Sequence, residues 1–327
     1  MIAHSPSRWP RLGLGCAALG TPPPGLDDEA AASVIAAAIG HGIRFFDVAP
    51  LYGGGLAEER LGRALACLPR DDYVLCTKTG VTRPYGETAM PRGAARRREF
   101  DRWDYSAKAT RASIQASLAR LRVDRLDVVH LHDVEDHLDE CLEAHNELQR
   151  LRSEGVVRAI GIGSNLTQSV QHLLARAEFS AFLVAGRYTL LDQSGGALLD
   201  VARERGLVVV AGGVFNSGVL AVWPQPAPTF GYEPADREIA ARTARIAFVC
   251  GRHGVPLAAA ALQFVLAHPA VTTVLIGPRS VAELEASLAA VHEPIPDALW
   301  SDLEAQKIIP RASPRPGTSL ESVLQSR

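Results

Sequence analysis

The sequence has few of the features that mark secreted, membrane-bound or nucleic-acid-binding proteins. Its formal net charge is only -2 at pH 7, so no basic excess favours nucleic acid or an anionic membrane as a partner. The first ten residues contain no apolar segment of the kind that a secretory signal needs. No later stretch runs for about 18 apolar residues without a charge. We therefore expect a cytoplasmic protein that acts on a small molecule.

Cysteine is also scarce. The chain has five cysteines, an odd number, and they are widely spaced and mostly in apolar segments: Cys16, Cys67, Cys76, Cys141 and Cys250. This pattern predicts reduced thiols rather than a disulfide framework. No pair has the spacing of metal ligands, so we expect no metal site.

What the chain does have is an alternation of short runs rich in Val, Ile and Leu with longer helical patterns. Such alternation is typical of repeated βα units around a buried parallel sheet. With 327 residues, of which 47% are hydrophobic, the chain is long enough for one large core. Eight units predict a single-domain (β/α)₈ TIM barrel over residues 1–327, with a mobile tail from about 310 to 327. The predicted strands lie near 11–15, 43–47, 73–77, 126–131, 158–162, 181–185, 207–211 and 271–275.

Two segments interrupt this alternation, at 80–105 and 223–234. Both follow predicted strands, so they lie on the face where barrel active sites form. Long connections of this kind are usually functional or disordered. The first is the longest insertion on that face, and we expect it to influence which substrate is accepted.

Polar side chains gather at the ends of three consecutive predicted strands. Asp47 ends the second strand, Tyr52 follows it, Lys78 ends the third strand, and His132 is the last inward-facing residue of the fourth. Singly, each has an ordinary explanation as a cap, a loop aromatic, a solvated lysine or a packed ring. Together they predict one reactive site, because an ammonium held by a carboxylate stabilises a phenolate whose ordinary pKa is about 10. His130 faces the same side one layer deeper, and we interpret it as a core histidine with satisfied hydrogen bonds.

These residues also form a recognisable pattern. Asp47-Val48-Ala49-x-x-Tyr52-Gly53, Glu58-Glu59-x-Leu61-Gly62, Lys78 and His132 resemble the aldo-keto reductase superfamily, and the similarity continues through segments 186–191, 215–218 and 276–280. The resemblance implies that Tyr52 is the general acid/base, that Lys78 and Asp47 tune it, and that His132 orients the substrate oxygen.

The resemblance further implies a nicotinamide cofactor. Asp47 would lie beside it, and Asn165 would bind the carboxamide, or Ser164 instead, since the segment 161–165 is one residue longer than in many relatives. Tyr188 would stack on the nicotinamide ring. A glutamine common in relatives is Ala185 here, so one amide contact is missing. The remaining predicted contacts are Phe215, Asn216, Ser217, Gly218 and Leu220 around the pyrophosphate, and Gly277, Arg279 and Glu283 beside the adenosine.

Segments 186–193 and 213–220 resemble one branch of this superfamily, the aldose 1-dehydrogenases that act on D-threo-aldoses, L-fucose or L-galactose, with pyridoxal 4-dehydrogenases as near relatives. This implies oxidation of an L-fucose, L-galactose or D-arabinose type sugar at C1 to the lactone, with Tyr52 as base. An aldehyde or ketone reductase, a pyridoxal 4-dehydrogenase and a non-catalytic nicotinamide-sensing barrel are the alternatives. The intact set of four polar residues argues against the sensor.

We expect NAD to be preferred over NADP, because a carboxylate at Glu283 would repel a 2′-phosphate and accept a hydrogen bond from a free ribose hydroxyl. Arg279 acts in the opposite sense, since a guanidinium pairs with a phosphate. Glu283 as a simple helix cap is the alternative interpretation. We expect a monomer or a small homo-oligomer.

Overall fold

The computed structural model describes residues 9–20, 26–83, 101–231 and 233–316. Within them, eight parallel strands close into a barrel, each paired with the next and the last with the first. All eight predicted strands are present, which confirms the (β/α)₈ barrel. In order around the barrel they are β1 (Leu12–Gly15), β2 (Phe45–Asp47), β3 (Val74–Thr79), β6 (Leu126–His132), β7 (Val157–Ser164), β8 (Ala181–Ala185), β9 (Val208–Gly212) and β12 (Thr273–Ile276).

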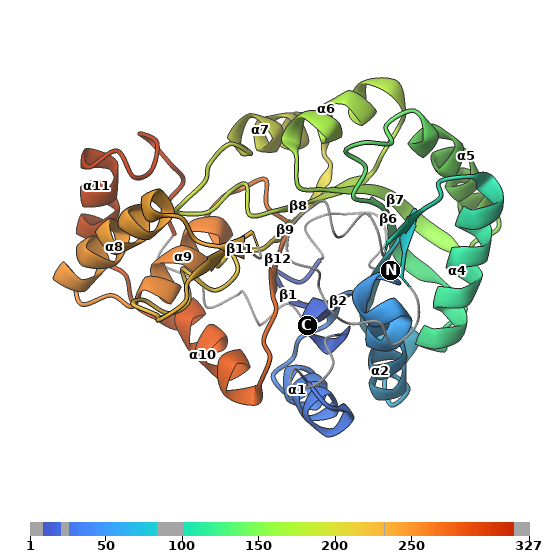
Figure 1. Ribbon diagram of the computed structural model, residues 1–327, viewed down its shortest axis with the longest axis horizontal. Coiled ribbons are helices and arrows are strands. Elements are labelled where there is room, and N and C mark those ends of the chain that lie inside the picture. The colour runs from blue at the N-terminus through green and yellow to red at the C-terminus, as the bar shows by residue number, and fades with distance from the viewer. Residues whose placement is uncertain (1–8, 21–25, 84–100, 232, 317–327) are drawn as a thin grey trace.

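Helices encircle the strands, as Figure 1 shows, from α1 in blue to α11 in red. Two of their starts follow directly from the sequence, because the Asp27 and Ser106 side chains accept hydrogen bonds from Ala30 N and Ala109 N as N-caps. The helices are α1 (Asp28–Gly40), α2 (Leu56–Leu65), α4 (Ala107–Leu121), α5 (Glu140–Ser153), α6 (Thr167–Arg176), α7 (Gly196–Arg205), α8 (Arg237–Arg252), α9 (Leu257–Leu266), α10 (Val281–His292) and α11 (Asp297–Ala305).

The inward-facing side chains of the barrel change from apolar to polar along the strands. Phe45, Cys76 and Val128 belong to a small buried cluster that is separate from the larger core beneath the helices. Because side chains alternate along a strand, the next inward residues are Asp47, Lys78 and His130, all buried. The carboxyl end of the barrel therefore carries a buried polar layer above an apolar one.

The two segments that interrupt the βα alternation each contain a small antiparallel pair. In the first, β4 (Val81–Thr82) pairs with β5 (Arg102–Trp103), and residues 84–100 lie outside the described part. In the second, β10 (Thr229–Phe230) pairs with β11 (Glu233–Pro234).

The first residues of the expected tail lie against α11. Ser313 is buried, and Arg315 pairs with Glu304 of α11 at 3.2 Å. Residues 317–327, where the tail was also expected to be mobile, lie outside the described part. Of the helices that the structure describes, no single one is long and apolar enough to cross a bilayer, and only the sharply bent pair of α8 and α9 passes that test by length and composition.

Candidate active site

Three of the predicted residues form a continuous polar chain at the carboxyl end of the barrel. Lys78 Nζ lies 2.5 Å from Asp47 Oδ1 and 3.1 Å from the Tyr52 hydroxyl oxygen, and it also donates to the Val48 carbonyl at 3.0 Å. The Lys78 and Asp47 side chains are only 1% and 3% exposed. The structure thus brings a carboxylate, an ammonium and a phenol into contact, and the ion pair itself is shielded from bulk water.

Burial and pairing act in opposite directions on Lys78. Burial alone lowers its pKa, but the neighbouring Asp47 and Tyr52 outweigh burial, so the pKa of Lys78 lies above its ordinary value. The ammonium is therefore charged at every ordinary pH. Burial raises the pKa of the Asp47 carboxyl, and the positive charge of Lys78 opposes that rise.

His132 completes the predicted set. Its ring lies edge to face with Tyr52, with 6.0 Å between the ring centroids, and Nε2 lies 3.9 Å from Asp133 Oδ1. Burial, assisted by the charge of Lys78, holds the pKa of His132 well below its ordinary value. The ring is therefore neutral and carries one N–H, which suits it to hydrogen-bond a substrate oxygen.

Three glycines follow Tyr52 in its loop, and the backbone of the loop packs closely against a fourth glycine, Gly20. Gly53, Gly54 and Gly55 all have positive φ, at 66°, 62° and 103°, a region that glycine adopts without steric cost. A Cβ at Gly20 would lie 2.3 Å from the Tyr52 carbonyl carbon. The glycine run therefore allows the tight turn that places Tyr52 over the barrel.

A buried ion pair that sequence reasoning missed lies beneath this loop. Glu58 of α2 is fully buried and accepts from Arg120 of α4, at 2.6 and 2.7 Å, and from the Thr77 hydroxyl of β3 at 2.7 Å. A Cβ at Gly55 would lie 2.7 Å from Arg120 Nε. The pair thus connects two helices and a strand directly under the Tyr52 loop.

At the end of β7, an unpredicted carboxylate positions two of the predicted cofactor contacts. Glu135 Oε1 accepts from the Ser164 hydroxyl at 2.8 Å and from the Asn165 backbone N–H at 2.7 Å. Asn165 Nδ2 lies 3.4 Å from Asp133 Oδ1. Ser164 is buried and Asn165 is exposed. Of the two alternatives for the carboxamide, Asn165 is thus the more accessible side chain.

The loop after β9 has an unusual backbone. Asn216, Ser217 and Gly218 follow one another with φ of 45°, 61° and 97°, and such a conformation is costly for the two residues that are not glycine. Asn216 Nδ2 donates to the Gly186 carbonyl at 3.4 Å, whereas its buried Oδ1 has no hydrogen-bond partner among the described protein groups. Strained residues of this kind concentrate at ligand-binding sites.

The start of α10 carries the last predicted contacts. Ser280 accepts from Glu283 N at 3.1 Å, and Glu283 Oε2 accepts from Arg279 N at 2.8 Å, close to a capping box. Glu283 Oε1 also lies 3.4 Å from the Arg279 guanidinium. Glu283 therefore acts as a helix cap in this structure, which was the alternative interpretation, while both side chains stay exposed.

Tyr188, another predicted cofactor contact, packs against two aromatic side chains. Its ring stacks on Phe264 of α9, with centroids 5.0 Å apart and planes 13° apart, and His268 lies edge-on at 4.8 Å. Gly186, two residues earlier, has a φ of 71°, in the left-handed region. Tyr188 is thus buried in the larger core, and its stacking on the nicotinamide stays a prediction.

His130 departs from expectation in one respect. It is fully buried, as a core residue should be, but neither ring nitrogen has a hydrogen-bond partner among the described protein groups. It lies beside Cys76 and Asp47, and their potential ligand atoms are all within 4.8 Å of one another.

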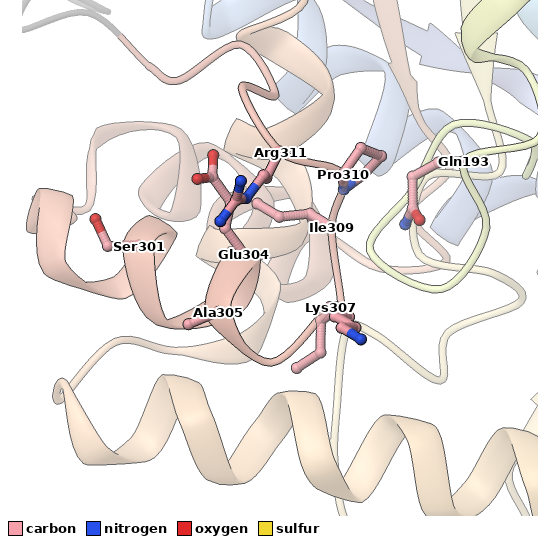
Figure 2. A pocket seen from close by; sticks show the side chains of 9 residues that line it. Gln193, Ser301, Glu304, Ala305, Lys307, Ile309, Pro310 and Arg311 are labelled. Atoms are coloured by element: carbon pink, nitrogen blue, oxygen red, sulfur yellow. The ribbon is translucent and has the colours of Figure 1, made fainter.

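A separate cavity of about 650 Å³ lies at the periphery of the barrel (Figure 2). It is formed by α11, the segment that follows this helix, and Gln193, and none of the predicted catalytic or cofactor-binding residues lines it. The cavity is therefore distinct from the site built on Lys78.

Comparisons with known proteins agree with this geometry. A sequence model described as the aldo/keto reductase family matches residues 11–308. The chain is 40% identical to a D-threo-aldose 1-dehydrogenase from Pseudomonas sp, over 92% of this chain and 95% of that protein. It is 35% identical to a pyridoxal 4-dehydrogenase from Microbacterium luteolum, over 91% and 94%. Its fold is similar to that of the aldo-keto reductase AKR11C1 from Bacillus halodurans, with a TM-score of 0.73, 27% identity, and coverage of 92% and 93%.

Proposed function

The chain belongs to the aldo/keto reductase family and is an oxidoreductase of that type, and on this premise we propose that it oxidises an aldose at C1 to the lactone. The observation that carries the proposal is the partly buried contact between Lys78 Nζ and the Tyr52 hydroxyl oxygen, 3.1 Å apart, combined with 40% identity to a D-threo-aldose 1-dehydrogenase. Sugars of the L-fucose, L-galactose and D-arabinose type are the proposed substrates.

Tyr52 takes the proton in this proposal. The sugar binds with its C1 hydroxyl between the Tyr52 oxygen and the neutral ring of His132, which donates a hydrogen bond and orients it. The Lys78 ammonium stabilises the phenolate that accepts the proton, and Asp47 keeps the ammonium in place. In the reverse direction the same groups would protonate a carbonyl oxygen.

The residues at the barrel mouth fit a nicotinamide cofactor. The unpartnered Asn216 Oδ1, the left-handed backbone at 216–218 and the exposed Arg279 at the start of α10 all suit an elongated, phosphate-bearing ligand. We propose that Asn165 binds the carboxamide, that the loop Phe215–Gly218 with Leu220 wraps the pyrophosphate, and that Gly277, Arg279 and Glu283 lie beside the adenosine. When bound, the nicotinamide would supply the acceptor for the hydride from C1.

We propose that NAD is preferred over NADP. The Glu283 carboxylate accepts a hydrogen bond from the Arg279 backbone N–H and lies beside the Arg279 guanidinium. It therefore partly neutralises the positive charge of Arg279. A 2′-phosphate arriving there would meet a negative charge at close range.

A second candidate is oxidation of pyridoxal, favoured by 35% identity to a pyridoxal 4-dehydrogenase over 91% of this chain. The same Tyr52 and Lys78 pair would serve that reaction. The two candidates differ in the substrate cavity and not in the proton-transfer residues.

The deciding experiment measures kcat/KM for a panel of aldoses and for pyridoxal, with NAD and NADP, in wild type and Tyr52→Phe. We expect an aldose with NAD to give the highest kcat/KM, and Tyr52→Phe to lose about 10²- to 10⁴-fold in turnover while still binding cofactor. Tyr73→Phe is the matched control, because Tyr73 is buried against Phe46 and Arg70, outside the site. A preference for pyridoxal would reject the aldose, and near-normal turnover by Tyr52→Phe would reject the proton-transfer role.

A further inference from the structure

A buried polar group surrounds the Asp47 carboxylate, and two of its three members have no assigned role. It consists of Asp47 from β2, Cys76 from β3 and His130 from β6, and all three are at most 2% exposed. In the barrel register Asp47 is level with Cys76, and His130 is level with Lys78. The group therefore lies beside the ion pair that contacts Tyr52 and shares Asp47 with it.

The neighbouring strand leaves room for the His130 ring. Gly161 of β7 is level with His130, and a Cβ at Gly161 would lie only 2.3 Å from His130 Nδ1. A larger residue on β7 would displace the imidazole. The ring is thus set into the barrel interior at this level, toward Asp47 and Cys76.

Several polar atoms in this group have no protein partner. Asp47 Oδ2 and both His130 nitrogens are buried and make no hydrogen bond to the protein groups that the structure describes. The Ile162 backbone lies near the ring, but its geometry is not that of a hydrogen bond. Leaving such atoms unpaired costs about 1–3 kcal/mol each. Their potential ligand atoms lie within 4.8 Å of one another, a spacing that one water molecule spans.

The protonation states of the three groups are complementary. Burial, together with the charge of Lys78, lowers the pKa of His130 to about 3, so the ring is neutral with one donor and one acceptor. Burial raises the pKa of the Cys76 thiol well above its ordinary value, so it keeps its proton. Asp47, engaged by Lys78 through Oδ1, has an acceptor free on Oδ2.

The same three side chains are potential metal ligands, but the surroundings favour hydrogen bonding instead. The Lys78 ammonium lies 2.5 Å from Asp47, and a cation bound between Asp47, Cys76 and His130 would compete with it for the same carboxylate. Like charges this close repel strongly in a dry site. A neutral donor meets no such repulsion.

We propose that His130 is a positioning residue for the proton-transfer site, donating a hydrogen bond to Asp47 Oδ2 through one bridging water that the Cys76 thiol also contacts. Asp47 is then held through both oxygens, by Lys78 on Oδ1 and by His130 on Oδ2. This orients the carboxylate, and hence the ammonium that lies 3.1 Å from the Tyr52 hydroxyl. The inference rests on the proposed role of Tyr52 as the proton-transfer residue.

The test is a double-mutant cycle between His130 and Asp47. His130→Leu removes the hydrogen-bond donor and fills the same space with an apolar side chain. We expect kcat to fall about 10-fold or more, as for a lost hydrogen bond to a charged group. The midpoint of thermal unfolding should fall, because Asp47 Oδ2 then loses its hydrogen-bond partner in the barrel interior. In an Asp47→Asn background, His130→Leu should change kcat by less than about threefold, because the two residues act as one unit. His130→Asn, which keeps an N–H donor, should recover part of the loss.

Val128→Ala is the matched control. Val128 lies two residues before His130 on the same inward face of β6 and belongs to the apolar layer. We expect it to lower the unfolding midpoint and to reduce kcat equally with and without Asp47→Asn.

Each outcome decides between the possibilities. A His130→Leu variant with wild-type kcat, or one that loses as much kcat in the Asp47→Asn background, overturns the proposal. If Tyr52→Phe is fully active in the same assay, the proton-transfer role itself fails, and the two failures are thereby separable. Nitrogen-15 spectra of the imidazoles provide a readout without turnover: we expect the His130 resonances of the wild type to show one neutral tautomer that changes in Asp47→Asn. An unchanged spectrum would contradict the contact.

Discussion

Lys78→Met tests how far the buried ammonium controls proton transfer. The Lys78 Nζ lies 3.1 Å from the Tyr52 oxygen, so a unit charge at this distance stabilises a phenolate by about 5 kcal/mol at an effective dielectric constant of about 20. Asp47, 2.5 Å from the same ammonium, carries the opposite charge and cancels part of this. We take roughly half, about 2–3 kcal/mol, as the net effect on the Tyr52 phenolate.

The sign of the pH effect follows directly. Oxidation needs Tyr52 deprotonated, and removing the ammonium disfavours the phenolate. The rise of kcat/KM with pH should therefore move upward by about two pH units in Lys78→Met, and activity at neutral pH should fall by about 10²-fold. The assay is the pH profile of kcat/KM for sugar oxidation, from mildly acid to alkaline pH, with cofactor affinity measured by fluorescence quenching.

Methionine keeps the length of the side chain, so packing changes little. Lys108→Met, at an exposed position of α4, removes the same charge from the protein surface and should leave the profile unchanged. If Lys78→Met kept the wild-type profile, or if its loss were entirely a loss of cofactor affinity, the electrostatic role of Lys78 would be refuted.

Four further predictions concern the surroundings of the site. Glu283→Gln should raise kcat/KM with NADP relative to NAD by roughly 5- to 10-fold. Glu285→Gln, at an exposed position of the same helix, is the control, and an unchanged ratio in Glu283→Gln would dismiss Glu283 as a selectivity residue. Arg120→Ala leaves the buried Glu58 carboxylate unpaired and should cost about 3–5 kcal/mol in the free energy of unfolding, as urea titration would show. Glu135→Ala should weaken cofactor binding about 10-fold with little change in kcat, whereas a lower kcat at unchanged affinity would place Glu135 elsewhere in the mechanism. Shortening the segment 80–105 should change the order of kcat/KM values across a panel of sugars. An unchanged order would show that the segment does not select the substrate.

The fold and the centre of the site were predictable because both depend on local periodicity. Apolar runs alternating with helical patterns predicted all eight barrel strands. The alternation of side chains along a strand then placed Asp47, Lys78 and His132 on the inward face, and the ends of adjacent parallel strands meet at one mouth. As a result, Lys78 Nζ lies 2.5 Å from Asp47 Oδ1 and 3.1 Å from the Tyr52 hydroxyl oxygen.

The tertiary structure decided the contacts between side chains far apart in the chain. Glu135 accepts from Ser164, 29 residues away, and Arg120 reaches Glu58 across 62 residues, and neither pair has a spacing that any periodic pattern reveals. Tyr188 stacks on Phe264 of α9, a contact between distant segments that the sequence pattern did not reveal. His130 followed the inward face as predicted, but whether its nitrogens find partners depends on which atoms the neighbouring strands bring within a few ångströms. Strand period determines the side of the sheet on which a residue lies, whereas hydrogen bonds depend on the packing of several strands at once.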